Sequence, residues 1–414
     1  MRSGLRIVHS LWSKPLELCV KRQRISGDWP SWKHYWYSWV LSAWQAHETQ
    51  GRIDLVTDSK GAEILIEQLG LPYRSVSLAL DELPEYVSPA LWAYGKVLAY
   101  EQQQSPFLHI DSDVYLWKKL PDWCGDAPVI AQSLETTPQY LAFEDIYNRP
   151  RRTFCNLMDK VPVSWHTYAE ENTSLNMGIF GGSDLSTIQA YCQQVREMVE
   201  HKANRSGWQA LAVTGLDNIG WSNMVVEQQT AYCVARQRGA RLHTLVKEVD
   251  PSKLSDAAKS VGYTHVMGSK KKPADHEFMQ RLEKRVREIS PDAYERIQGG
   301  FGLTGGCGST KTTQKSTVIS KGVNVIKHIS HAGASVVKTS LGINRASEDQ
   351  VKERLVVCEN CPGEHAVWKN GKLYTCGPML ESMKKEGKGT CGCVLNLKVR
   401  DLAEECPFGW WDKK

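Results

Sequence analysis

Short apolar runs alternate with helix-patterned segments along the first part of the chain, and this alternation restricts the possible folds more than any other feature. Strands that alternate with helices form a mostly parallel sheet with helices on both faces. The sequence therefore predicts an α/β fold. The predicted strands lie at 5–8, 53–57, 73–78, 107–110 and 175–180, and the predicted helices at 62–69, 89–104 and 274–297.

The length of 414 residues predicts two domains, or one large catalytic domain with an appendage. Gly299 to Gly308 has the composition of a flexible linker and follows the last predicted helix of the first part. We therefore expect a catalytic domain at 1–297, a glycine-rich and then basic linker at 298–350, and a cysteine-rich module at 351–414.

The charge distribution excludes few classes of function. The net charge is +5, and residues 296–347 contain five lysines and no acidic residue. Such a segment is either a solvated linker or one that lies against a polyanion. The sequence contains no run of the roughly 18 apolar residues that span a bilayer, and its start does not resemble a signal peptide. We expect a cytoplasmic protein without membrane insertion.

An acidic pair directly follows the apolar strand at 107–110. Asp111 and Asp113, with Ser112 between them, are placed to direct two carboxylates at one ion above the sheet edge. Hard oxygen ligands suit Mn²⁺ or Mg²⁺. The alternative is a turn that carries two solvated acids.

A second motif lies far downstream. His265, Gly268 and Lys271 have the spacing H-x-x-G-x-x-K. An imidazole can be a third ligand for Mn²⁺, a glycine lets the backbone approach a phosphate, and a lysine supplies positive charge. A lone histidine before a loop is more often structural, but with the acidic pair it would complete a diphosphate–metal site.

The chain carries five motifs in this order: Lys96, the Asp111–Asp113 pair, Asn176 with Gly178, Glu227 with Gln228, and the motif of His265, Gly268 and Lys271. Together they resemble the glycogenin-like, family-eight type of GT-A glycosyltransferase. The resemblance covers roughly residues 5 to 297.

The resemblance implies a GT-A-like sheet and metal-dependent transfer of a sugar from a nucleotide-sugar donor, UDP by analogy, to an acceptor that is a protein, a glycan or a nucleic acid. The first strand lacks the usual Thr-Asp-x-x-Tyr for the base. By resemblance, Asp111, Asp113 and His265 bind Mn²⁺ or Mg²⁺; Lys96, Asp111, Ser112, Asp113, Gly178, Gly268 and Lys271 bind the donor; and Asn176, Glu227 and Gln228 act on the donor sugar.

Six of the twelve cysteines lie in the last 57 residues and resemble a short zinc-ribbon-like tail. A Cys-x-x-Cys pair with two later cysteines forms a tetrahedral, structural zinc site. Disulfides in an extracellular particle are the alternative. Cys358, Cys361 and Cys406 are the predicted ligands, and Cys376, Cys391 and Cys393 compete for the fourth position unless two ions share them.

Five tryptophans lie between Gly27 and Ala46. Trp29, Trp32, Trp36 and Trp39 recur at steps of three and four, which places them on one helix face. We expect an aromatic core stripe, with a sugar-stacking platform as the alternative.

Two other functions compete with glycosyl transfer. The first is a non-catalytic protein with a vestigial glycosyltransferase fold, which docks on nucleic acid or on a particle through the basic segment and the zinc tail. The second is a nucleotidyltransferase, which also uses paired carboxylates on a similar sheet. The motif at His265 fits the second less well.

Overall fold

The chain divides into two compact units in a computed structural model. The first unit comprises residues 1–205 and 220–309, and the second comprises 206–219 and 310–414. The domain boundaries at 297 and 350 stay predictions. The structure describes residues 6–137, 139, 142–213, 222–266, 276–300, 347–360, 366–369 and 372–376.

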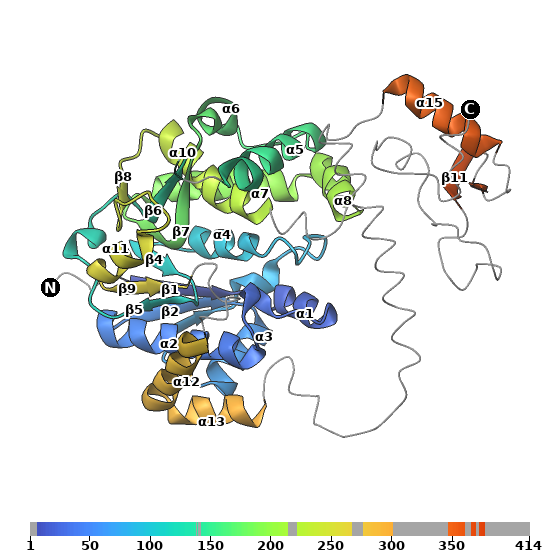
Figure 1. The fold of residues 1–414 in the computed structure, drawn as a ribbon. Helices are drawn as coiled ribbons and strands as arrows, with labels where there is room; N and C mark the ends of the chain where they lie inside the picture. Colours follow the sequence, from blue (N-terminus) through green and yellow to red (C-terminus); the bar gives the residue numbers. More distant parts are fainter. Residues whose placement is uncertain are drawn as a thin grey trace, which may run out of the picture. The chain divides into compact units, whose positions relative to one another are not determined.

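One seven-stranded sheet forms the centre of the first unit (Figure 1). Its strands are β1 (Arg6–Leu11), β2 (Ile53–Thr57), β3 (Ser75–Ser77), β4 (Phe107–Ile110), β6 (Val129–Thr136), β7 (Thr173–Gly182) and β8 (Leu242–Thr244). They lie in the order β3-β2-β1-β4-β7-β6-β8. Only β7 runs antiparallel to its neighbours, β4 and β6. The predicted α/β fold with a mostly parallel sheet is confirmed.

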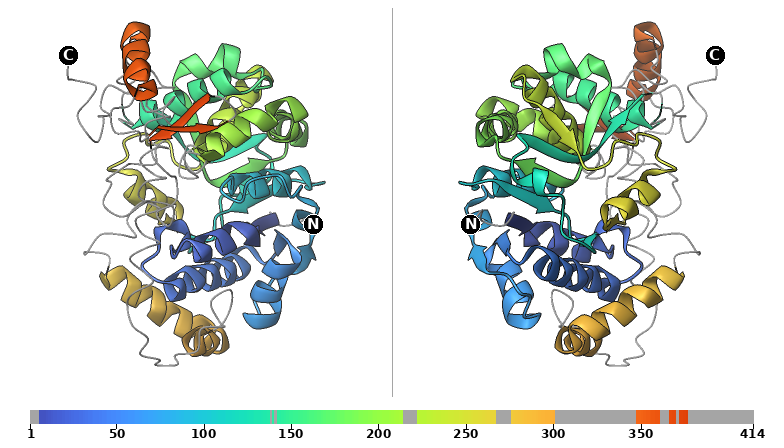
Figure 2. Two further views of the ribbon diagram at one scale, coloured as in Figure 1. Left: turned by 90° about the vertical axis from the view of Figure 1, so that its right-hand side faces the viewer. Right: turned by 90° about the vertical axis from the view of Figure 1, so that its left-hand side faces the viewer.

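Helices cover both faces of this sheet, which explains why β2 and β4 are buried at every residue and have mostly apolar sequences. One face carries α4 (Ala93–Glu101), α7 (Leu185–Glu200) and α10 (Thr230–Gln237). The other carries α2 (Trp32–Gln50), with α12 (His276–Ile289) and α13 (Pro291–Gly299) packed beneath it (Figures 1 and 2). Other described α-helices of this unit include α1 (Ser13–Lys21), α3 (Ser59–Ala62), α5 (Arg149–Leu157), α6 (Trp165–Tyr168) and α11 (Leu254–Val261).

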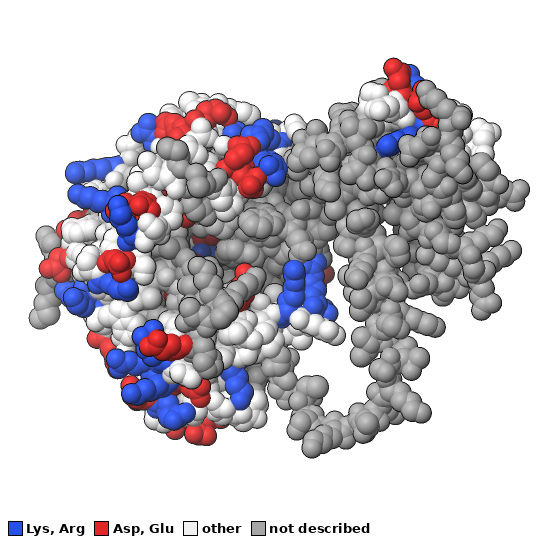
Figure 3. All heavy atoms as spheres, viewed as in Figure 1, with Lys and Arg blue, Asp and Glu red and all other residues white. Residues whose placement is uncertain are grey.

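Basic and acidic side chains lie side by side over α12 on the face seen in Figure 3. Arg281 pairs with Glu277 at 3.2 Å and Lys284 with Glu288 at 3.9 Å, each four residues apart on the exposed helix face. Such exposed pairs contribute little to stability. They identify α12 as a solvated outer layer.

Helix boundaries differ from the sequence predictions where backbone chemistry overrides apolar spacing. The predicted helix at 274–297 is two helices, because Pro291 begins α13 and cannot continue α12. The predicted helix at 62–69 begins at Ser59, where Asp58 caps α3, and continues as a π-helical turn at Glu63–Gln68. The helix predicted to begin at Pro89 begins at Ala93.

The tryptophan-rich segment belongs to the core, as expected. Trp29, Trp36 and Trp39 are buried, and Trp32 is partly buried. The placement of all four on one helix is wrong for Trp29, since Ser31 caps α2 and the helix begins at Trp32.

The second unit contains α8 (Arg205–Val213, except its first residue), α15 (Glu348–Glu359) and a hairpin of β10 (Ala366–Lys369) and β11 (Lys372–Cys376). Cys358 is buried on α15. The side chain of Cys376 is not described, and Cys361, Cys391, Cys393 and Cys406 lie outside the described residues. The zinc site therefore stays a prediction.

No described helix combines the length and apolar character needed to cross a bilayer.

Candidate metal and donor site

The acidic pair lies in a tight turn at the carboxyl edge of the sheet. Strand β4 ends at Ile110, and the chain turns through Asp111 to Asp113 into the short strand β5 (Val114–Leu116). The amide of Asp111 donates to the carbonyl of Gly178 at 2.9 Å, and the amide of Val114 donates to the carbonyl of Asp111 at 3.0 Å. These bonds fix the backbone that carries both carboxylates.

Helix α2 supports this turn from below with two buried serines one helical turn apart. Ser38 Oγ donates to the carbonyl of Ser112 at 2.7 Å, and Ser42 Oγ donates to the carbonyl of Val114 at 2.7 Å. The helical spacing of Ser38 and Ser42 inside an aromatic segment was the only sequence signal for this support. Ser112 thus contributes its carbonyl to the scaffold.

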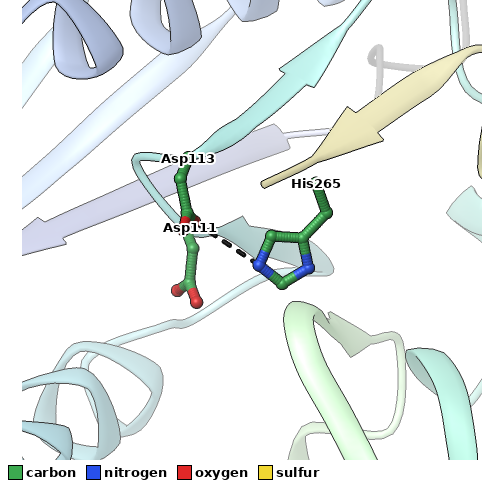
Figure 4. Close-up of side chains that lie close together, drawn as sticks. All are labelled: Asp111, Asp113 and His265. Carbon is green, nitrogen blue, oxygen red and sulfur yellow. Dashed lines mark ion pairs between the residues drawn. The ribbon is translucent and has the colours of Figure 1, made fainter. Parts of the chain in front are cut away.

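A small antiparallel pair of strands brings His265 to the acidic turn. Strand β9 (Tyr263–His265) pairs with β5, with Val114 opposite His265, and the amide of Val266 donates to the carbonyl of Asp113 at 3.0 Å. His265 Nε2 lies 3.4 Å from Asp113 Oδ1 (Figure 4). One ligand atom each of Asp111, Asp113 and His265 lie within 4.8 Å of one another.

The imidazole of His265 is held by Gln132 on β6. His265 Nδ1 lies 2.7 Å from Gln132 Oε1, which accepts its proton and leaves Nε2 facing Asp113. Gly178 makes room for this ring: a Cβ at that position would lie 2.3 Å from His265 Cε1. The glycine of the N-x-G motif therefore accommodates the histidine, and Gln132 is a site residue that sequence reasoning missed.

Replacing Gln132 with Met should weaken Mn²⁺ binding by roughly 10- to 100-fold, the usual cost of losing the partner that orients a metal-binding histidine. Mn²⁺ titration followed by electron paramagnetic resonance measures this affinity. Gln103→Met is the matched control, since Gln103 is as buried as Gln132 (2% exposed) and its amide instead donates to the carbonyl of Ala99. Equal Mn²⁺ affinity in the Gln132 variant and the wild type would show that Gln132 does not orient a metal ligand.

Lys96 lies between two acidic residues. Its Nζ is 2.7 Å from Asp111 Oδ1 and 2.6 Å from Glu227 Oε1. Burial favours the neutral amine, but the two carboxylates outweigh it and raise the pKa of Lys96. Burial raises the pKa of Asp111 and of Glu227 against the opposing effect of Lys96. The sequence predicts that Lys96 faces the donor. In the structure its ammonium group bridges Glu227 and Asp111, and Asp111 is a candidate metal ligand.

Glu227 is fully buried in the π-helical turn Val225–Gln229. Its Oε1 also accepts from Tyr100 Oη at 3.1 Å. Among the described residues, its Oε2 has no hydrogen-bond partner. A buried carboxylate oxygen without a donor is costly, so Oε2 adds to the free-energy cost of burying Glu227.

A buried polar cluster lies on β6, β7 and the neighbouring helical turns. Asn176 Nδ2 donates to Glu135 Oε1 at 3.0 Å, and Tyr147 Oη lies 2.5 Å from both Glu135 Oε2 and Gln228 Oε1. Burial raises the pKa of Glu135. Asn176 is two residues from Gly178 on β7, so its side chain is on the face against which His265 packs. Glu135 and Tyr147 were not predicted, because neither belongs to a recognisable motif.

The structure therefore brings together residues of four of the five sequence motifs: Lys96, the acidic pair, the Asn176–Gly178 strand and the Glu227–Gln228 turn. Of the fifth, His265 joins them. Gly268 and Lys271 lie outside the described residues.

These features define a mostly parallel α/β protein with two carboxylates and an imidazole grouped at the carboxyl edge of its sheet. The chain belongs to a family described as "Family of unknown function (DUF6734)", whose sequence profile matches residues 5–299.

Similar solved structures include two glycosyltransferases. The WbbM bifunctional glycosyltransferase, in its apo form, is 10% identical over 72% of this chain and 52% of its own, with a TM-score of 0.35. Mouse xyloside xylosyltransferase 1, in its apo form, is 12% identical over 58% of this chain and 85% of its own, with a TM-score of 0.28. The chain spans about half the length of the first. At such TM-scores neither likeness bears on the reaction. No curated protein matches the chain.

Proposed function

We propose that the first unit transfers a sugar from a nucleotide-diphosphate donor, UDP by the sequence resemblance, to an acceptor hydroxyl in a reaction that requires Mn²⁺ or Mg²⁺. The supporting observation is that His265, from a distant part of the chain, lies close to the acidic pair Asp111 and Asp113. Two ligands of one ion lie at most about 4–5 Å apart, since oxygen–metal distances are roughly 2.0–2.6 Å. The observed grouping within 4.8 Å fits one divalent ion.

The residues of the site have distinct proposed roles. An ion bound by Asp111, Asp113 and His265 supplies positive charge to the donor diphosphate, with Gly268 and Lys271 proposed to contact the phosphates. Asn176 and Glu227 hydrogen-bond hydroxyls of the donor sugar. Gln228 lies at the face of the reacting carbon.

In the proposed reaction, the bond between the anomeric carbon and the donor phosphate oxygen breaks, and a bond to the acceptor oxygen forms. The acceptor proton leaves with the released nucleoside diphosphate. The polar cluster of Asn176, Glu135, Tyr147 and Gln228 holds its members in fixed orientations before the donor binds, which lowers the cost of ordering them.

Thermal unfolding with a panel of nucleotide sugars, each with and without Mn²⁺, tests the proposed donor. A ligand that binds only the folded chain stabilises it by about 2.7 kcal/mol at 100 times its Kd. We expect a rise in Tm for a UDP-sugar only when Mn²⁺ is present. Release of UDP then identifies glycosyl transfer, whereas release of pyrophosphate identifies nucleotidyl transfer and contradicts the proposal.

The cysteine-rich module is proposed, from the sequence alone, to bind structural zinc through Cys358, Cys361, Cys406 and one further cysteine, and to recruit the acceptor. Its boundaries at 351–414 and the cytoplasmic location of the protein are proposals of the same kind.

A further inference from the structure

Trp92 is the one exposed side chain in a buried segment. From Ala90 to Tyr100 every other residue is buried, whereas Trp92 is 40% exposed. Helix α4 begins directly after it and is buried between the sheet and α7. The exposure of Trp92 therefore does not come from a helix that lies on the surface.

The indole ring lies beside the candidate site. Lys96 follows Trp92 by one helical turn, and its Nζ lies over the ring, 5.7 Å from the centroid. The same Nζ is 2.7 Å from Asp111 Oδ1, and the side chain of Asp111 is 27% exposed. Trp92 and the metal-ligand candidate Asp111 thus flank one ammonium group, and both are reachable from solvent.

A buried side chain fixes the backbone on both sides of this tryptophan. Asn223 Oδ1 accepts from the amide of Ala93 at 2.8 Å, and Asn223 Nδ2 donates to the carbonyl of Ala90 at 2.9 Å. Asn223 is fully buried and precedes the π-helical turn that carries Glu227. The backbone that carries the Trp92 ring is therefore held by hydrogen bonds to Asn223, which precedes the turn of Glu227.

We propose that Trp92 is a sugar-binding residue, whose indole face stacks on the apolar C–H face of a pyranose ring at the reaction centre. The indole face carries negative charge density that attracts polarised C–H groups, and its exposed area gains free energy when it is covered. The hydroxyls at the edge of such a ring lie within reach of the charged groups around Lys96. This inference rests on the proposed function, and the pyranose belongs to the donor or to the acceptor.

Binding measurements with Trp92→Ala and Trp92→Phe distinguish the two sources. The first experiment compares the Kd of UDP and of a panel of UDP-sugars in the presence of Mn²⁺. The second compares the KM of a methyl glycoside acceptor at saturating donor. We expect Trp92→Ala to weaken one of these sugar interactions roughly tenfold, with UDP alone unaffected and most of the loss restored by Phe. Trp123→Ala is the control, since Trp123 is equally exposed (40%) but its ring packs against His243.

An NMR titration of Trp92 tests sugar binding by this residue independently of whether the protein transfers a sugar. The indole N–H signal of Trp92 in the NMR spectrum, assigned by its loss in Trp92→Phe, is followed during titration with UDP-sugars and with free pyranoses. A loss in the donor arm assigns the ring to the donor sugar, and a loss in the acceptor arm assigns it to the acceptor. Unchanged constants with an unmoved signal overturn the inference, even if a UDP-sugar binds with Mn²⁺. If no UDP-sugar binds but free pyranose shifts the signal, the proposed function fails, and only the assignment of Trp92 as a pyranose-binding residue stands.

Discussion

Replacing Asp113 with Asn is expected to reduce Mn²⁺-dependent release of UDP from the donor by at least roughly 10²–10³-fold, the loss seen when one electrostatic contact with transition-state charge is removed. Asparagine keeps the size of the side chain and deletes its charge, so the fold should remain. Asp113 Oδ1 lies 3.4 Å from His265 Nε2, close enough for the two atoms to bind the same ion. Removing the charge of Asp113 should therefore weaken the binding of that ion. A coupled assay for UDP measures the effect.

The matched control for Asp113→Asn is Asp122→Asn, which deletes an exposed carboxylate that pairs with Lys119 at 3.0 Å. It should retain wild-type turnover. If Asp113→Asn and the wild type release UDP at the same rate, Asp113 is not a metal ligand.

Replacing Lys96 with Met should destabilise the metal-free protein by about 3–5 kcal/mol at neutral pH, the usual result of removing one partner from a buried ion pair. The substitution leaves the carboxylates of Asp111 and Glu227 without the ammonium that both contact, and Glu227 is fully buried. Urea unfolding in the presence of EDTA measures the loss. The double variant Lys96→Met/Glu227→Gln should recover most of it, because the uncompensated charge is gone.

The destabilisation by Lys96→Met should shrink as the pH falls. Burial raises the pKa of Glu227 in the folded protein, and removal of Lys96 raises it further. A carboxyl group whose pKa is raised in the folded state stabilises that state at low pH. This stabilisation is lost as the pH rises from the pKa of the group in the unfolded chain, about 4.3, through its pKa in the folded protein. The loss should therefore be smaller near pH 5 than near pH 8. A loss that is equal at both values would show that the buried charge is not its cause.

Five of the seven strands of the central sheet and the acidic pair were predictable because local chemistry determines them, whereas β6 and β8 were not predicted. Strand β4 is buried on both faces, so three of its four residues are apolar, and the polar residues that follow it mark the edge of the sheet. The helix at 274–297 was predicted as one element because its apolar spacing continues across Ser290. The missing amide proton of Pro291 outweighs that spacing.

The support of the site was not predictable from local patterns. Strands β5 and β9 have three residues each, too few for a recognisable alternation, yet their pairing brings His265 to Asp113. Gln132 and Ser38 matter only through tertiary contacts. The burial of Glu227 behind Lys96 likewise follows from packing, so its place in a sequence motif could not show that its Oε2 is buried without a hydrogen-bond partner among the described residues.

Titration of Mn²⁺ in the presence of UDP, followed by the loss of the free-ion signal in electron paramagnetic resonance, tests most directly whether Asp111, Asp113 and His265 hold one ion. The wild type should bind one ion per chain, and His265→Gln and Asp113→Asn should each lose this binding while they remain folded. Binding of Mn²⁺ by both variants with the affinity of the wild type would contradict the metal site, and with it the proposed donor site.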